Sequence, residues 1–299
     1  MHSWLTASYC PKGYVLDMPG VAVVTDSTAY LPPGVAAQFG VTVVPLHVVL
    51  GTWSGLEEVE VSPADVAAAL GERRVQVTTS RPTPGQLAAA YRATGATEVV
   101  SVHLSSHLSG TTDSARLAAQ HVAPDISVRV VDSGSIAMGL GFDVIAAAEA
   151  ARAGGTLEEV AAAAEKADTT TLVYVDTLEQ LRRSGRVRAT SALVGAALAV
   201  KPLLVVREGE LVLLEKVRTF SRALARLQEL AVEAAGGADH AGEVQVAIHH
   251  LAAPERAAQL EAELREALPR LTQLYVSEVG AVVGAHAGPG LLGVVVWRC

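Results

Sequence analysis

Four short segments carry hydroxyl side chains directly after an expected strand: residues 26–28, 78–80, 105–111 and 132–135. The third is the most informative, because residues 97–103 have the β-branched composition of a strand and residues 110–119 that of a helix. A helix N-terminus leaves backbone N–H groups unpaired, so it can hold a carboxylate or phosphate without a basic side chain. The four turns therefore suggest the polar rim of an anion-binding pocket. Alternatively, Ser109 or Thr111, like Asp26, simply caps a helix.

Motif spacing argues against several enzyme classes. The sequence has no G-x-S-x-G, so Ser106 and Ser109 lack the strained turn that exposes a serine nucleophile. It has no G-x-x-x-x-G-K-[ST], so there is no P-loop for ATP. The segment GPGLLG at 288–293 matches G-x-G-x-x-G, but it precedes an expected terminal strand and opens no helix. We interpret it as a chance match.

Histidine and arginine positions give weaker signals. His103 and His107 are four residues apart with no third ligand nearby, so no metal site is predicted. His286 lies in a glycine-rich segment that lets other atoms approach closely, but spacing alone favours a structural histidine. The segment RRSGRVR at 182–188 gathers four arginines around one glycine. In a chain of net charge −8, this cluster favours a solvated or partner-docking surface over nucleic-acid binding.

Composition predicts a globular protein with a substantial core. Half of the 299 residues are hydrophobic and 18% are charged, which suits one large domain or two medium ones. Aromatic residues, at 4%, are too few for a base-stacking platform. The longest apolar run, residues 193–200, is too short to cross a bilayer, so no stable membrane insertion is expected.

The chain ends also carry information. Residues 1–20 lack both the basic and the apolar regions of a signal peptide, and we expect an unstructured extension there. Cys10 and Cys299 show neither metal-ligand spacing nor a disulfide framework, which suits a reducing cytoplasm.

Strands alternate with helices along most of the sequence, which predicts an α/β fold. In the first half, strands are expected at 21–25, 41–49, 97–103 and 126–131, and helices at 33–39, 64–70, 84–93, 110–119 and 143–152. In the second half, we expect helices at 156–167, 178–183, 191–200, 221–235 and 254–268, and strands at 171–175, 244–249 and 271–276. Residues 201–219 are expected to form a hairpin that turns near Glu208 and Gly209.

Seven ordered motifs give the chain a resemblance to a known family. They are VVTDST at 23–28, TTSRPTPG at 78–85, SSHLSGTTDSA at 105–115, VVDSGSIAMGLG at 130–141, SGRV at 184–187, KPLL at 201–204 with KVR at 216–218, and GAHAGPG at 284–290. Together they resemble the DegV family over residues 21–299. In bacteria, members of this family are the fatty-acid-binding subunits of fatty acid kinase.

The resemblance implies a two-domain α/β protein. Residues 21–155 would form a mostly parallel sheet with helices on both faces, and residues 156–299 an α/β domain with a mixed or antiparallel sheet. A long-chain fatty acid would lie in a buried tunnel with no further cofactor. Its carboxylate would be held by Thr79, Ser80, Ser109, Gly110 and His286. Arg186 would engage a separate ATP-dependent kinase subunit, so the chain would be a cytoplasmic lipid-binding protein of phospholipid metabolism and not itself an enzyme.

Some residues depart from the family pattern. Arg81 stands where a neutral glutamine is frequent, Met138 where a serine is common, and Thr112 and Asp113 where an aromatic residue and an amide are usual. A competing hypothesis is a serine-dependent acyl hydrolase that uses Ser109 and His286, with an orienting acid such as Asp132.

Overall fold

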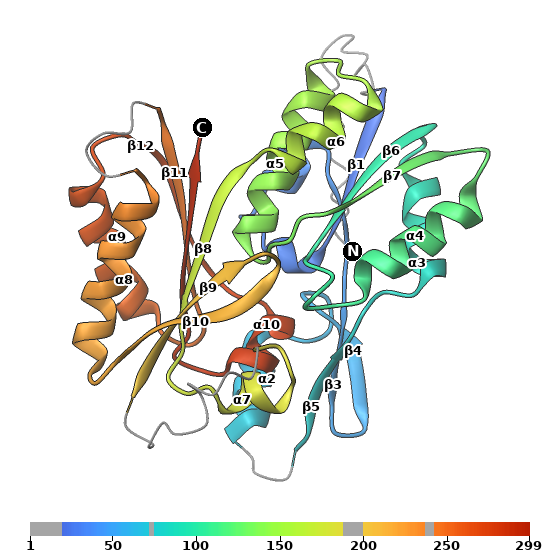
Figure 1. Cartoon of the computed structure of the whole chain (residues 1–299). Coiled ribbons are helices and arrows are strands. Elements are labelled where there is room, and N and C mark those ends of the chain that lie inside the picture. Colours follow the sequence, from blue (N-terminus) through green and yellow to red (C-terminus); the bar gives the residue numbers. More distant parts are fainter. Residues whose placement is uncertain (1–19, 72–74, 188–199, 237–241) are drawn as a thin grey trace, which may run out of the picture.

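The computed structural model describes residues 20–71, 75–187, 200–236 and 242–299 (Figure 1). Residues 1–19 of the predicted extension, Arg188 of the arginine cluster and nearly all of the helix predicted at 191–200 lie outside the described residues. None of the helices within the described ranges is long and apolar enough to cross a bilayer.

The first sheet contains four parallel strands in the order β2, β1, β6, β7. These strands are β1 (Val21–Asp26), β2 (Thr42–Val44), β6 (Glu98–His103) and β7 (Ser127–Asp132). One face is covered by α3 (Pro84–Ala93) and α4 (Thr111–Val122), the other by α5 (Met138–Arg152) and α6 (Leu157–Glu165). Alternation along the strands places Val24 and Val99 on the α3/α4 side, and Val23 and Val100 on the α5 side. The predicted parallel sheet with helices on both faces is confirmed.

The second sheet is mixed, with strand order β10, β9, β8, β13, β11, β12, and only β11 and β12 pair in parallel. Its strands are β8 (Asp168–Tyr174), β9 (Lys201–Arg207), β10 (Glu210–Val217), β11 (Val244–His250), β12 (Leu271–Glu278) and β13 (Leu292–Arg298). One face packs on α8 (Phe220–Ala234) and α9 (Pro254–Ala267). The other packs on α5, which therefore lies between the two sheets (Figure 1).

Residues from both halves of the chain build a third, smaller unit. Its antiparallel sheet contains β3 (His47–Leu50), β4 (Trp53–Leu56) and β5 (Val77–Ser80), and its helices are α2 (Pro63–Gly71), α7 (Glu179–Arg183) and α10 (Ala281–Ala287). Buried side chains of α10, including Val282, pack with Leu46 and Val48. A short helix η1 (Ser27–Ala29) and α1 (Val35–Phe39) complete the described elements.

The single strand predicted at 41–49 is wrong. Residues 42–44 pair with β1, whereas residues 47–50 pair with β4 and β5 in a different sheet. Pro45 separates the two strands, because proline lacks the N–H that would continue the ladder.

The hairpin of β9 and β10 turns as predicted. Glu208 and Gly209 both have positive φ, 51° and 79°, as a tight two-residue hairpin turn requires.

The predicted boundary at residue 155 remains a proposal. Next to it, α5 packs on both large sheets and α6 packs on β6 and β7.

Candidate functional site

A cavity of about 320 Å³ lies where the two large sheets, α5 and the small unit meet. Most of its wall is apolar, from side chains on several elements: Leu46, Leu104, Leu108, Ile136, Val173, Leu181, Leu211, Val279, Val282, Leu291 and Val295. A mostly apolar cavity with a few polar groups is the usual form of a small-molecule site. The expected hydrophobic compartment is therefore present between the sheets.

Two pairs of residues on the neighbouring strands β8 and β13 form the floor of the cavity. On β8 and β13, Val173 pairs with Gly293 and Thr171 pairs with Val295, and all four residues line the cavity. Residues two apart on a strand share a face, so these two pairs form successive rungs of the cavity floor. Gly293 places no side chain beside Val173. The floor therefore runs from the pair Val173 and Gly293 to the pair Thr171 and Val295, and we refer to this strip as the groove.

The polar residues predicted from the family resemblance lie together in one part of the cavity wall, which we call its polar end. Thr79, Ser80, Ser109, Gly110 and His286 all line the cavity, and Arg81 and Arg186 accompany them. The structure thus brings together residues from β5, the loop before α4, and α10.

His286 has one ring nitrogen in use and one without a partner. Its Nε2 lies 2.8 Å from the Thr79 hydroxyl, whereas its buried Nδ1 has no hydrogen-bond partner among the described residues. Burial, reinforced by the positive charge of Arg186, lowers the pKa of His286 to about 4. The ring is therefore neutral at pH 7. If Thr79 donates to Nε2, the proton lies on Nδ1, which then faces a ligand as a donor.

His249 lines the same cavity but serves the fold. Its Nε2 accepts a hydrogen bond of 3.1 Å from the backbone N–H of Met138, and its Nδ1 lies 3.1 Å from the Ser277 hydroxyl. Burial lowers the pKa of His249 to about 4, so it too is neutral. Both nitrogens are occupied, which distinguishes His249 from His286.

The loop before α4 presents its hydroxyls without capping the helix. Gly110 is the N-cap residue, and no side chain caps α4. The Ser109 hydroxyl instead lies 2.9 Å from that of Thr111. The capping interpretation of Ser109 and Thr111 is therefore wrong. The N-cap residue Gly110 lines the cavity and no side chain caps the N-terminus of α4, which is the arrangement that an anion site requires.

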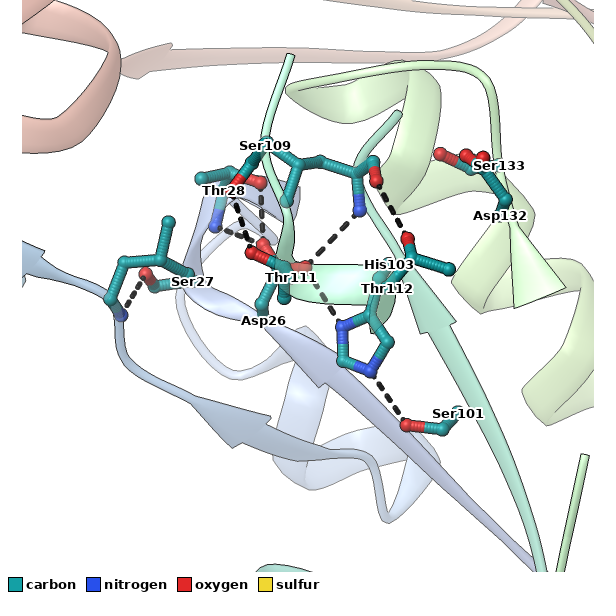
Figure 2. Close-up of polar contacts among 12 residues, drawn as sticks. Asp26, Ser27, Thr28, Ser101, His103, Ser109, Thr111, Thr112, Asp132 and Ser133 are labelled. Carbon is teal, nitrogen blue, oxygen red and sulfur yellow. Dashed lines mark hydrogen bonds and ion pairs between the residues drawn. The ribbon is translucent and has the colours of Figure 1, made fainter. Parts of the chain in front are cut away.

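A buried network holds this loop in place (Figure 2). The Asp26 carboxylate accepts bonds from His103 Nδ1 at 2.9 Å and from the backbone N–H of Leu104 at 3.2 Å. It also caps η1 by accepting from the backbone N–H of Thr28 at 3.1 Å. On the other side of the ring, His103 Nε2 lies 2.7 Å from the Ser101 hydroxyl. His103 is thus a satisfied core residue that ties β1 to β6.

The expectation that all four hydroxyl turns form one rim is wrong for two of them. Residues 26–28 are buried in the network around Asp26, and they do not line the cavity. Ser133 and Ser135 line a separate polar cleft of about 670 Å³ beside α5. Asp132 accepts bonds of 3.1 Å from the backbone N–H groups of Ser106 and Gly134. The polar rim of the apolar cavity is therefore formed by β5 and by the loop before α4.

A second buried network fixes α10, the helix that carries His286. The Glu57 carboxylate accepts bonds from the Val282 backbone N–H at 2.7 Å, from the Tyr30 hydroxyl at 3.0 Å and from the Ser27 hydroxyl. Burial raises the pKa of Glu57 to about 7, although the three donors oppose the shift. The sequence analysis missed this residue, because a glutamate in a polar stretch gives no signal of burial.

A polar cavity of about 560 Å³ adjoins the apolar one. Thr79, Arg186 and His286 line both cavities and so form the wall between them. Gln180 and Arg183 line only the polar one. These three side chains therefore lie between the polar end of the apolar cavity and the polar cavity.

The arrangement needed by an acyl hydrolase is not among the hydrogen bonds of the described residues. Ser109 bonds to Thr111 and His286 to Thr79, and no acid contacts the imidazole of His286. A search of the same residues found no cluster of histidine, cysteine and acidic side chains that could hold a metal ion.

Comparison with known proteins identifies the family. Residues 20–298 match the family described as an uncharacterised protein of the DegV family. The chain belongs to the DegV family. A DegV domain-containing protein of Streptomyces coelicolor is 56% identical over 281 residues, covering 92% of this chain and 98% of the relative. Protein DegV of Bacillus subtilis is 35% identical over 279 residues, covering 92% and 98%.

Solved DegV structures share the fold. A DegV family protein of Thermus thermophilus, described by its fatty acid binding, has a TM-score of 0.86 at 31% identity, covering 93% of this chain and 99% of its own. DegV of Bacillus subtilis, described as a fatty acid binding protein, has a TM-score of 0.84 at 33% identity, with the same coverage. The two-domain α/β architecture expected from the resemblance is confirmed.

Proposed function

We propose that this protein binds a long-chain fatty acid in the apolar cavity. The carboxylate would lie at the polar end, contacted by Ser80, Ser109, Gly110 and His286, with Thr79 holding the imidazole. The observation that carries the proposal is the buried Nδ1 of His286, which has no partner at the polar end of an otherwise apolar cavity. An unsatisfied buried polar atom costs free energy that a ligand carboxylate would recover. The fatty acid binding of DegV relatives supports the same ligand class.

The acyl tail and the carboxylate head of the ligand would contribute differently to binding. Each buried methylene contributes about 0.8 kcal/mol, so the tail would dominate the affinity. Hydrogen bonds at the head contribute about 1 kcal/mol each, so they would set the orientation. We propose no further cofactor.

We further propose that the bound carboxylate is presented to a separate ATP-dependent kinase subunit, which forms the acyl phosphate in the cytoplasm for phospholipid synthesis. The protein itself would carry no ATP site and perform no chemistry. Supporting this, Arg186 lies in the wall between the two cavities, where a partner that enters the polar cavity would meet it. Among the described residues, its guanidinium bonds only to backbone carbonyls, those of Leu108 and Ser184, which leaves its charge for a partner.

Mass spectrometry of an organic extract from the purified protein tests the binding step. We expect a stoichiometric fatty acid in the wild type and much less in the double variant Ser109→Ala, His286→Ala. The matched control is Ser106→Ala, His107→Ala, which changes the same residue types at exposed positions outside the cavity. A wild-type protein that carries no fatty acid, and takes up none when offered palmitate, contradicts the proposal.

The kinase step has its own test. Arg186→Met should retain the bound fatty acid but lose ATP-dependent acyl phosphate formation when the kinase subunit of the source organism is added. Wild-type protein that yields no acyl phosphate with that subunit would refute presentation to a kinase while leaving fatty acid binding intact.

A further inference from the structure

Two arginines border the polar end of the cavity, and neither pairs with a carboxylate among the described residues. Arg81 is exposed, and its Nη1 donates only to the Gly110 carbonyl oxygen, at 3.3 Å. Arg186 likewise donates to backbone carbonyls. By contrast, several arginines elsewhere have acidic neighbours, such as Arg116 with Asp113 at 3.1 Å and Arg226 with Glu215 at 2.9 Å.

The position of Arg81 depends on the glycine beside it. Gly110 has φ of −78°, which any residue adopts, so backbone conformation does not require glycine here. A Cβ at this position would instead collide with the Arg81 guanidinium. The absent side chain thus lets the guanidinium lie against the loop that opens α4, at the edge of the cavity.

At the polar end of the cavity, the lining residues that carry a positive charge are Arg81 and Arg186. His286 is neutral, so it offers a hydrogen bond but no charge. Ser80, Ser109 and Thr79 are uncharged hydroxyls. Arg186 borders the polar cavity as well, whereas Arg81 lines only the apolar one. A guanidinium without a carboxylate partner, beside the polar end of an apolar cavity, is placed for a carboxylate that arrives with the ligand.

We propose that Arg81 determines head-group specificity: its guanidinium pairs with the ionised carboxylate of the bound fatty acid and selects it over neutral lipids of the same length. This inference rests on the proposed function and deepens it. It also changes the expectation from the sequence, in which helix N–H groups and hydroxyls hold the anion without a basic side chain.

A competition experiment separates charge recognition from tail binding. Protein stripped of lipid is incubated with equal amounts of palmitate and hexadecanol, and the ratio of the two bound lipids is measured by mass spectrometry. We expect Arg81→Met to lower the ratio of palmitate to hexadecanol about tenfold, which corresponds to about 1.4 kcal/mol. Arg81→Lys should restore most of the ratio. Raising the salt concentration should lower it in the wild type more than in Arg81→Met.

Arg92→Met is the matched control. Arg92 is also exposed and also donates to one backbone carbonyl at 3.3 Å, that of His121, but it lies outside the cavity. This variant removes the same charge from the protein and should leave the ratio unchanged.

Each remaining outcome has a separate meaning. If the wild type binds palmitate and Arg81→Met keeps its ratio, the role of Arg81 is refuted while the proposed function stands. If Arg81→Met loses both lipids equally, Arg81 acts through packing, and charge selection is again refuted. If the wild type takes up neither lipid, the proposed function fails first.

Discussion

The hydroxyl of Thr79 lies 2.8 Å from Nε2 of His286, although the two residues are 207 positions apart in the chain. Thr79 belongs to β5 and His286 to the last turn of α10, so this bond joins the first part of the chain to its end. It fixes the ring with Nδ1 unpartnered in the cavity wall. We therefore expect Thr79 to act on a bound fatty acid through His286.

Thr79→Val should weaken palmitate binding about fivefold to tenfold. The substitution keeps the shape of the side chain but removes the hydroxyl, and one hydrogen bond contributes about 1 kcal/mol. Thr79→Ser should restore the wild-type affinity. Isothermal titration calorimetry on lipid-free protein measures both. Thr78→Val is the control, because Thr78 is exposed and does not line the apolar cavity. Equal affinities for Thr79→Val and the wild type would contradict the positioning role.

Glu57 should make stability depend on pH. Burial raises the pKa of its carboxyl from 4.5 to about 7, so the folded state holds the proton more tightly than the unfolded state. Its favourable contribution is complete below pH 4.5 and is lost as the pH rises to about 7. The loss amounts to about 3 kcal/mol.

Chemical denaturation of wild type and Glu57→Gln between pH 4.5 and 8 measures this effect. The amide does not titrate, so the difference in unfolding free energy between the two proteins should shift by about 3 kcal/mol in favour of the variant as the pH rises. A constant difference across the range would show that the pKa of Glu57 is the same in the folded and unfolded states, which would contradict the shift caused by burial.

Val173→Phe should exclude long acyl chains while sparing short ones. Val173 lies on the cavity floor beside Gly293, so a larger side chain fills the groove that we assign to the tail. Displacing about two methylenes removes about 1.6 kcal/mol, so palmitate should bind at least tenfold more weakly. Octanoate should bind as it does to the wild type. Unchanged palmitate affinity, in a variant whose thermal unfolding matches the wild type, would place the tail elsewhere.

Much of the fold follows from local patterns. The β-branched run before Ser105 predicts β6, and the alanine-rich segments at 84–93 and 143–152 predict α3 and most of α5. Pro45 is the local signal that divides the strand predicted at 41–49 into β2 and β3. The glycine-rich, apolar last stretch of the chain predicts a terminal strand, which is confirmed as β13, but it gives no signal for α10. There, tertiary packing overrides weak local propensity.

The ordered family motifs predict the residues of the site better than local residue chemistry does. Spacing alone favoured a structural role for His286, because nothing local shows that one ring nitrogen lacks a partner while those of His249 are both bonded. Likewise, no local signal separates the turn at Asp26, which is buried in a network, from the turn at Ser109, which borders the cavity. Such distinctions depend on contacts between distant segments.

A crystal structure of the protein with palmitate tests the central claim most directly. We expect the acyl chain to follow the groove past Val173 and Gly293 toward Thr171, with a carboxylate oxygen within hydrogen-bond distance of Nδ1 of His286. A carboxylate at the Thr171 end, or an acyl chain outside this cavity, would contradict the account.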